Sequence, residues 1–371
     1  MSLAKIFLFE KSESHTRFFS EKGNLAVRKS VFIFSVVAAT LFACNDDEPI
    51  VEEAALAPFK TSTIESFVQA GAQISDELVA LGRMLFYEER LSKAHDISCN
   101  TCHNLATFGV DNEAFSAGHR GQLGGRNSPT VYNASMQFVQ FWDGRAKTVE
   151  EQALGPITNP VEMAMPEDGN RVVATLESMP AYVEAFTRLF PGEAQPVSME
   201  NIGKAIGAFE RRLITPTRFH AFLAGDEKAL TQAEQRGLKT FLEAGCASCH
   251  RGPGVGGTQY RKLGEMEAWP GIEDKGRRDV TTVPEDEHFF KVPTLLNVAK
   301  TAPYGHNGQT ATLEEAVRNM AKYQLAKTLS EADIQSILSF LNALTGEIPT
   351  DFIQKPTLPQ STATTPEPDA S

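Results

Sequence analysis

The sequence contains few cysteines, few tryptophans and no excess of positive charge. Its 371 residues include five Cys and two Trp, with 35 Lys and Arg against 47 Asp and Glu. The net charge of −12 argues against a nucleic-acid-binding protein, which normally carries a basic patch or a high isoelectric point. The composition also excludes collagen-like, low-complexity and many-pass membrane proteins. An odd number of cysteines would leave one thiol unpaired in an exported protein.

The N-terminal segment is typical of a targeting sequence. A basic pair precedes an apolar run over residues 31–42, which is too short to span a bilayer. Residues 41–44, L-F-A-C, resemble the bacterial lipobox, in which the cysteine carries a lipid after cleavage. We predict a lipoprotein signal peptide at 1–43 and a lipid anchor at Cys44 on the periplasmic side of the bacterial envelope. The alternatives are a short membrane anchor or a free cysteine. Residues 1–26 are long for the basic start of a signal peptide, which suggests a start of translation near Val27.

Both ends of the remaining chain have the composition of unfolded segments. Residues 44–60 begin with acidic side chains and Pro, which predicts a solvated tether. Residues 353–371 are rich in Pro, Thr and Ser, and we expect disorder because they bury too little apolar surface. We predict an N-terminal domain at 61–222 and a C-terminal domain at 223–352. Loss of residues 1–43 removes six basic and three acidic residues, giving a net charge of −15 that favours a donor with a basic docking face.

Four of the five cysteines form two C-x-x-C-H motifs, the pattern of c-type haem attachment. The residues are Cys99, Cys102 and His103 in the first motif, and Cys246, Cys249 and His250 in the second. The two thiols of such a motif bind the haem covalently, and the histidine becomes the proximal iron ligand. A zinc site would leave both histidines unexplained, and a thioredoxin-like pair would need a βαβ context that neither flank suggests. The motifs therefore predict two covalently bound haem c groups.

Apolar residues at helical spacing flank both motifs. One of these segments begins at the capping box Thr231–Glu234, and another opens at Ser330–Asp333. The apolar stripes are Leu78, Leu81 and Leu85; Ile202, Ile206, Phe209 and Leu213; Leu238, Phe241 and Leu242; and Ile334, Ile337, Leu338 and Leu341. A helix, a haem motif, a loop and a closing helix make up a small cytochrome c domain. We therefore predict a mainly α fold with two cytochrome c-like domains.

The two halves also share residues at a fixed shift of 164 positions. Seven residues align with identical residues: Pro129, Thr130, Asn133, Gly144, Thr148, Glu150 and Glu151 with Pro293, Thr294, Asn297, Gly308, Thr312, Glu314 and Glu315. This agreement in one gapless register suggests internal duplication of an ancestral unit. At the same shift Trp142 lies opposite His306, so the halves differ where chemistry is expected.

The chain resembles the bacterial di-haem cytochrome c peroxidases, a family that includes the MauG-type enzymes. The resemblance covers about residues 70–352. Its marks are R-N-S-P-T at 126–130, Q-F-W-D-G-R at 140–145, N-P-V-E-M at 159–163, V-P-T-L at 292–295 and A-P-Y at 302–304. The resemblance implies a peroxidatic haem in the N-terminal half and an electron-transfer haem in the C-terminal half.

For the peroxidatic haem, the resemblance implies His103 as proximal ligand and His119 as the sixth ligand of the resting state. A Gly-rich loop around His119 suits a ligand that must move away, although an exposed histidine would also be ordinary there. Glu162 resembles the distal acid–base residue, since a carboxylate beside an open iron position can transfer a proton between peroxide oxygens. Gln152 resembles the accompanying distal amide. If they have no catalytic role, Glu162 is a solvated loop residue and Gln152 is an ordinary helix residue.

For the electron-transfer haem, the resemblance implies His250 and Met320 as axial ligands, and a thioether ligand raises the reduction potential. A tyrosine replaces this methionine in MauG-type enzymes, and Tyr323 lies close by in the sequence, but the register favours Met320. The indole of Trp142 is implied to lie on the electron path between the haems. Met320 and Trp142 would otherwise be core residues. A calcium ion is implied as well, bound at Asn127, Thr301 and Pro303.

These features predict a peroxidase that reduces hydrogen peroxide to water with electrons from a small c-type cytochrome or cupredoxin. The alternatives are MauG-like oxidation of a protein side chain and a di-haem electron carrier without catalysis. We expect no nucleic-acid partner, membrane contact through the lipid only, and a protein that is compatible with a homodimer.

Overall fold

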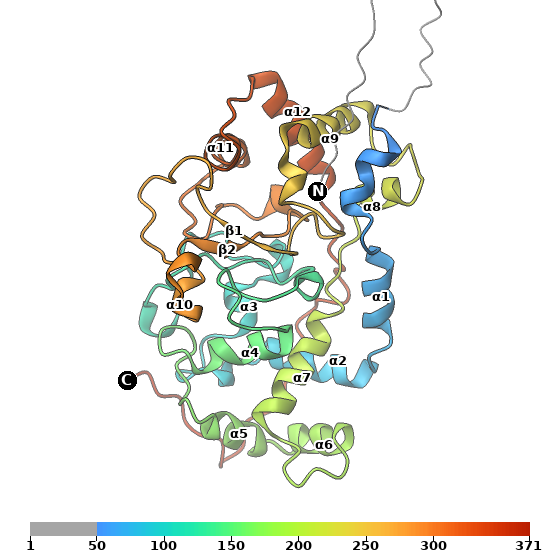
Figure 1. The fold of residues 1–371 in the computed structure, drawn as a ribbon. Helices are drawn as coiled ribbons and strands as arrows, with labels where there is room; N and C mark the ends of the chain where they lie inside the picture. Colours follow the sequence, from blue (N-terminus) through green and yellow to red (C-terminus); the bar gives the residue numbers. More distant parts are fainter. Residues whose placement is uncertain (1–49) are drawn as a thin grey trace, which may run out of the picture. The chain divides into compact units, whose positions relative to one another are not determined.

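The computed structural model describes residues 50–371, which form helices joined by long loops and one small sheet (Figure 1). The helices are α1 (Ile64–Ala72), α2 (Asp76–Phe86), α3 (Cys99–Cys102), α4 (Val149–Thr158), α5 (Asn170–Glu177), α6 (Pro180–Leu189), α7 (Met199–Glu210), α8 (Arg218–Leu223), α9 (Gln232–Ala244), α10 (Arg278–Thr281), α11 (Leu313–Asn319) and α12 (Glu331–Ala343). The sheet pairs β1 (Tyr260–Lys262) with β2 (Phe289–Lys291) in antiparallel register. The mainly α prediction is confirmed; strands this short show no readable alternation of apolar and polar residues. The predicted signal peptide and Cys44 lie outside the described residues.

One hydrophobic core surrounds α2, α4 and α7. The predicted stripe residues Leu81, Leu85 and Ile206 are fully buried within it. Helix α2 packs directly on α7 at Gly82, where an added Cβ would lie 1.8 Å from the carbonyl oxygen of Ala205. The missing side chain therefore allows the two helix backbones to approach closely, and Cys99 of the haem motif at α3 packs against the same core.

A second hydrophobic core surrounds α9 and α12. Leu238 and Ile334 from the predicted stripes are buried in this part of the molecule. Helix α9 also approaches its partner through a glycine, because a Cβ on Gly237 would lie 2.1 Å from the carbonyl oxygen of Ser336. The reciprocal capping box predicted at Thr231 forms. Each half thus places a pair of tightly crossed helices beside its C-x-x-C-H motif.

The prediction of a solvated tether at 44–60 is wrong for the C-terminal part of that segment. Residues Glu53–Phe59 form a 3₁₀-helix, and Leu56 and Phe59 are buried in the second core. The ring of Phe59 meets that of Phe219 edge-on at a centroid distance of 5.2 Å. Acidic composition predicted solvation, but the apolar side chains among the acidic ones bury enough surface to fold this segment. The domain boundary between residues 222 and 223 stays a prediction.

Local structure recurs at the 164-residue shift. Asn133 and Asn297 both adopt the left-handed backbone conformation, with φ of 61° and 64°. Both side-chain amides donate to the buried hydroxyl of Thr215, at 2.8 Å and 2.9 Å. Gly144 and Gly308 also share a positive φ, at 69° and 59°. The hydroxyl of Thr215 therefore links the two segments that share residues at this shift, and internal duplication stays a prediction.

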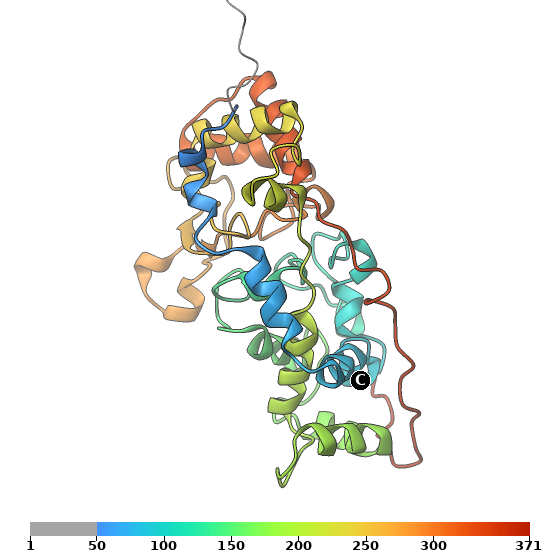
Figure 2. The ribbon, with the colours of Figure 1, turned by 90° about the vertical axis from the view of Figure 1, so that its right-hand side faces the viewer.

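The C-terminal segment 353–371 lies along the N-terminal half of the molecule, which differs from the predicted disorder (Figure 2). Ile353 is buried, and Arg90 donates to the carbonyl oxygen of Pro359 at 2.8 Å. Asp369 forms an ion pair with Lys93 at 3.4 Å. The prediction considered only what the segment buries by itself. Its contacts instead depend on polar partners supplied by a surface that is already folded.

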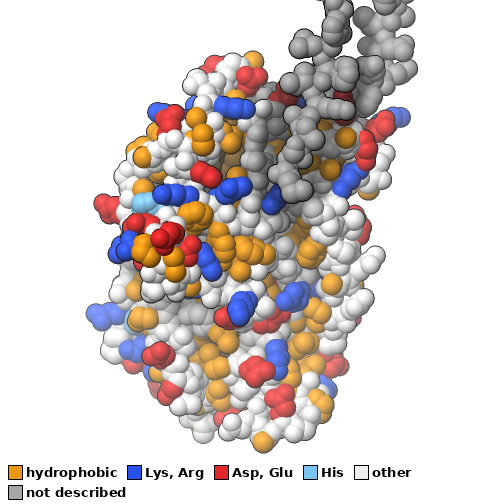
Figure 3. Space-filling view, in the orientation of Figure 1, with side chains coloured by type: hydrophobic (Ala, Val, Ile, Leu, Met, Phe, Trp, Pro, Cys, Tyr) orange, Lys and Arg blue, Asp and Glu red, His pale blue; other side chains and the backbone are white. Residues whose placement is uncertain are grey.

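Charges of both signs are interspersed on the face shown in Figure 3, and hydrophobic atoms gather near its middle. This face therefore presents no field of a single sign that would select a basic partner. Within residues 50–371, no helix has the length and apolar character needed to cross a membrane.

Candidate functional site

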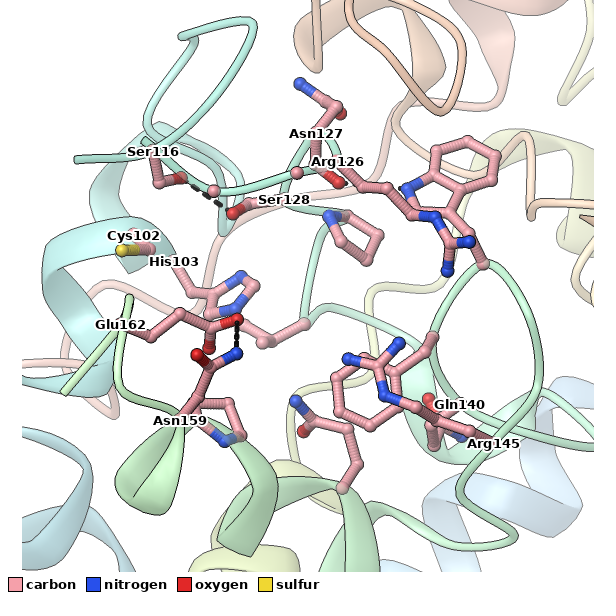
Figure 4. Close-up of a pocket in the computed structure, with 18 of the residues that line it drawn as sticks. Cys102, His103, Ser116, Arg126, Asn127, Ser128, Gln140, Arg145, Asn159 and Glu162 are labelled. Carbon is pink, nitrogen blue, oxygen red and sulfur yellow. Dashed lines mark hydrogen bonds between the residues drawn. The ribbon is translucent and has the colours of Figure 1, made fainter. Parts of the chain in front are cut away.

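A cavity of about 750 Å³, here called the first cavity, opens beside α3 and α4 (Figure 4). The predicted site residues that line it are Cys99, Cys102, His103, Asn127, Trp142, Gln152 and Glu162. They come from α3, from α4 and from the loops on either side of α4, and only the fold brings them together.

The helix that carries the first haem motif is a single turn fixed by its own caps. Ser98 and Thr101 cap it reciprocally. Burial raises the pKa of the Cys99 thiol to about 12 and that of Cys102 to about 11, so both are protonated, unpaired thiols. Burial also lowers the pKa of His103, which favours the neutral imidazole. A neutral imidazole is the form that binds a metal.

Glu162 follows α4 and lines the first cavity together with His103 (Figure 4). Its carboxylate accepts a hydrogen bond from Asn159 Nδ2 at 2.9 Å. Burial raises the pKa of Glu162, while the Arg145 guanidinium and the Asn159 bond partly oppose that shift. The Glu162 carboxylate is therefore fixed by the Asn159 amide and partly desolvated, and its affinity for a proton is increased.

His119 is the predicted residue that the structure does not bring into the cavity lining. Its ring is buried, and Nε2 lies 3.2 Å from the backbone oxygen of Ser371. Its backbone N–H donates to the carbonyl oxygen of Glu162 at 2.7 Å, so the His119 loop crosses the Glu162 segment. Gly118 permits the crossing, since a Cβ there would lie 2.0 Å from the carbonyl oxygen of Val161.

A cluster of charged side chains around the buried Asp143 borders the first cavity. Arg126 forms two hydrogen bonds to Asp274, at 2.7 Å and 2.8 Å, and one to Asp143 at 2.5 Å. Asp143 also pairs with Arg145 at 3.0 Å. Burial opposes the charge on Arg126, but these carboxylates outweigh it and raise the pKa, so the guanidinium stays charged. The two arginines already have carboxylate partners within the protein.

A second cavity, of about 250 Å³, lies in the C-terminal half. Its lining includes Cys246, Cys249, His250 and Met320, the predicted set for the second haem. Burial lowers the pKa of His250 to about 4, so this imidazole is neutral as well. Met320 stands at the start of the π-helix Met320–Gln324, which widens the end of α11.

Tyr323, the competing candidate, is not among the residues that line the second cavity. Its ring packs on Trp269 at a centroid distance of 5.0 Å. Its carbonyl oxygen accepts bonds from the backbone of Met266 and Glu267, both at 3.1 Å. The geometry therefore favours Met320 over Tyr323 as the residue that faces the cavity.

Trp142, which is predicted to lie between the haems, is among the residues that line both cavities. Its indole Nε1 donates to the carbonyl oxygen of Asn127 at 2.9 Å. The predicted calcium ligands Asn127, Thr301 and Pro303 all line the second cavity. Among residues 50–371, no three His, Cys, Asp or Glu side chains cluster as a metal site, so any calcium here would depend on neutral oxygens.

The residues present fit two haem c groups. Each cavity has a pair of unpaired thiols at its edge and a neutral imidazole next to them. The Nδ1 atoms of His103 and His250 are buried without a hydrogen-bond partner in the described part of the chain. A disulfide would leave these histidines without a role, and no three His, Cys, Asp or Glu side chains of residues 50–371 cluster as a zinc site would require. Covalent haem uses all three side chains of each motif.

Two buried charged residues that line the cavities were not predicted from the sequence. Glu210 lines the first cavity from α7, is 3% exposed, and has its pKa raised to about 8 by burial. Lys291 on β2 lines both cavities. The available signal was a charge on an apolar face: Glu210 lies four residues after Ile206 of the stripe, and Lys291 interrupts an apolar run.

Comparison with known proteins agrees with this geometry. Residues 76–228 match the family model described as di-haem cytochrome c peroxidase. The cytochrome c551 peroxidase of Pseudomonas aeruginosa is 46% identical over 305 residues, which cover 80% of this chain and 86% of that protein. The cytochrome c551 peroxidase of Nitrosomonas europaea is 46% identical over 293 residues, covering 78% and 86%. A crystal structure of a MauG-like protein associated with microbial copper homeostasis has 29% identity and a TM-score of 0.69, covering 76% of this chain and 94% of that chain.

Proposed function

The chain belongs to the di-haem cytochrome c peroxidase family, and from this premise we propose that it reduces hydrogen peroxide to two molecules of water with two electrons from a small redox protein and two protons. The peroxidase relatives are 46% identical and the MauG-like structure 29% identical, which favours peroxide reduction over side-chain oxidation. The observation that carries the proposal is the placement of Glu162 and His103 on one cavity.

Bound haem would supply the iron that accepts electrons and binds peroxide, chemistry that no side chain of this protein provides. Cys99 and Cys102 would hold the first group covalently, with His103 as its proximal ligand. Cys246, Cys249 and His250 would hold the second group in the second cavity, which Met320 also lines.

Glu162 is the proposed proton carrier for peroxide. Its carboxylate takes the proton from one peroxide oxygen and delivers it to the other, which then leaves as water. The Asn159 amide holds the carboxylate at 2.9 Å. Gln152, on the same cavity, is positioned to donate its amide N–H to a bound oxygen.

His119 is the proposed displaceable ligand of the first haem. In this structure His119 lies in a loop outside the cavity lining and contacts Ser371. This position supports a side chain that can lie either at Ser371 or in the cavity. Removal of His119 from the cavity leaves room for peroxide beside Glu162.

The second cavity is the proposed point of electron entry. Ligation by His250 and Met320 suits a centre of higher potential that collects electrons from a c-type cytochrome or cupredoxin. The contact of Trp142 with both cavities supports its role on the path between them.

Calcium, lipid attachment and dimerisation complete the proposal. No described residue donates a hydrogen bond to Asn127 Oδ1, while Nδ2 donates to the Glu113 carbonyl at 2.9 Å. That oxygen is therefore free to bind calcium together with Thr301 and Pro303.

Attachment at Cys44 and a periplasmic location rest on the sequence, as does compatibility with a homodimer.

Mixing the half-reduced protein with peroxide in a stopped-flow instrument tests the function. We expect peroxide to be consumed with oxidation of a reduced cytochrome c in a ratio of one to two. An electron carrier would oxidise the cytochrome without consuming peroxide. No turnover by calcium-loaded, fully haem-loaded protein would refute the proposal.

A further inference from the structure

Lys291 is a buried cation placed between the two cavities. It ends the short strand β2 and is 4% exposed. Its backbone N–H donates to the carbonyl oxygen of Trp142 at 2.8 Å, which fixes the lysine beside the residue proposed to link the two centres. Lys291 lines both the first and the second cavity.

The ammonium group of Lys291 has no carboxylate partner within 4.0 Å among the described residues. Its one hydrogen bond, from Nζ to Gln137 Oε1 at 2.5 Å, goes to a neutral amide. Burial lowers the pKa of Lys291 to about 7, and the opposing acid, Asp143, is already engaged by Arg126 and Arg145. A charge removed from water in this way is costly unless it is paired, so a bound anion would be needed to keep Lys291 fully protonated at neutral pH.

The other cations that line the cavities do not share this situation. Arg126 and Arg145 contact carboxylates, as described above, and Arg261 lies 3.5 Å from Glu265. Lys275 is exposed to solvent. Within residues 50–371, Lys291 is thus the lining cation that is both buried and without an acidic partner. The position of Lys291 therefore points to an anionic partner that belongs to a group bound in the cavities.

The anionic groups of a haem are the two carboxylates on its porphyrin edge. We propose that Lys291 is the counter-ion for porphyrin carboxylates at the junction of the two cavities, and that its charge raises the reduction potential of at least one haem. A nearby buried cation favours the reduced state, which carries one more negative charge than the oxidised state. Lys291 is a positioning residue in this role, and the inference rests on the two-haem function proposed above.

Potentiometric titration of the haem-loaded protein tests the role of Lys291. We compare the Lys291→Met and Lys291→Gln variants with Lys291→Arg, which keeps the charge. Lys262→Gln is the matched control, because Lys262 lies on the neighbouring strand β1 with an exposed side chain. The neutral variants are expected to lower at least one midpoint potential, while K291R and K262Q stay near the parent values. Unchanged potentials in both neutral variants would overturn the proposal.

Two further measurements keep the outcome decisive. Haem content and circular dichroism establish that each variant is folded and carries two haems; a parent protein without two haems would refute the proposed function rather than the role of Lys291. If the neutral variants do not fold, resonance Raman spectra of the parent protein in H₂O and D₂O decide. A deuterium shift of the porphyrin carboxylate bending mode supports the N–H donor, and its absence contradicts it.

Discussion

Replacement of Glu162 by Gln tests the proton-transfer step with little change in shape. The introduced amide keeps an oxygen that can accept the Asn159 bond, which is 2.9 Å long in the parent protein, but it cannot accept the peroxide proton. A positioned acid–base group contributes roughly 10²–10⁴-fold to a rate. We therefore expect the rate of peroxide reduction to fall by about that factor, equivalent to ~3–5 kcal/mol in the activation free energy.

The pH dependence gives a second readout of the same variant. Glu162 must be deprotonated to accept a proton, and burial raises its pKa above the usual value for a glutamate. The parent rate should therefore fall as the pH decreases through that raised pKa. This decline should be absent from the E162Q variant, because the replaced side chain does not titrate.

The assay is the single-turnover reaction of half-reduced protein with peroxide, followed by haem absorbance over a range of pH. Glu167→Gln serves as the control, since it makes the same chemical change on an exposed side chain in the following loop. A loss of less than tenfold in E162Q, or the same loss in E167Q, would refute Glu162 as the proton carrier.

Three other perturbations probe the second haem, the C-terminal segment and the junction between the repeats. Met320→Leu removes the proposed thioether ligand and should lower the midpoint potential of the second haem, measured by redox titration; an unchanged potential would exclude this ligand. Deletion of residues 356–371 removes the contact of Ser371 with His119, which is 3.2 Å long. The six-coordinate low-spin signal in electron paramagnetic resonance of the half-reduced protein should then increase. An identical spectrum would show that the segment has no effect on His119. Thr215→Val leaves two buried amide donors unpaired, and at about 1–3 kcal/mol each it should destabilise the protein by ~2–6 kcal/mol in denaturant unfolding. A loss below ~1 kcal/mol would show that these amides find other partners.

Much of the chemistry is readable from local sequence. The two C-x-x-C-H motifs need only adjacent residues to predict haem attachment. The capping box predicted at Thr231 forms, and the helix predicted to open at Ser330 begins there. These signals act within one helical turn, so the rest of the chain has little influence on them. The family resemblance then supplied roles for Glu162, Trp142 and Met320, which the fold places in the linings of the two cavities.

Other features depend on partners that are distant in the sequence. The C-terminal segment looked disordered because it buries little by itself, yet its Asp369 pairs with Lys93 from the other end of the described chain. The place of His119 likewise depends on the crossing of its loop over the Glu162 segment and on the position of Ser371. Composition and periodicity contain no information about such contacts.

The sequence by itself determined the mainly α fold, the two C-x-x-C-H motifs that predict haem attachment and the acidic character of the protein, because each follows from nearby residues or from simple counts. Only the tertiary structure decided that Glu162 shares a cavity with His103, that Tyr323 lies outside the lining of the cavity of Met320, and that Lys291 is a buried cation without an acidic partner. The physical reason is that burial and charge pairing depend on what surrounds a side chain in space. The apolar run around Lys291 marks the lysine as unusual in the sequence, but only the fold shows that it is buried without an acidic partner.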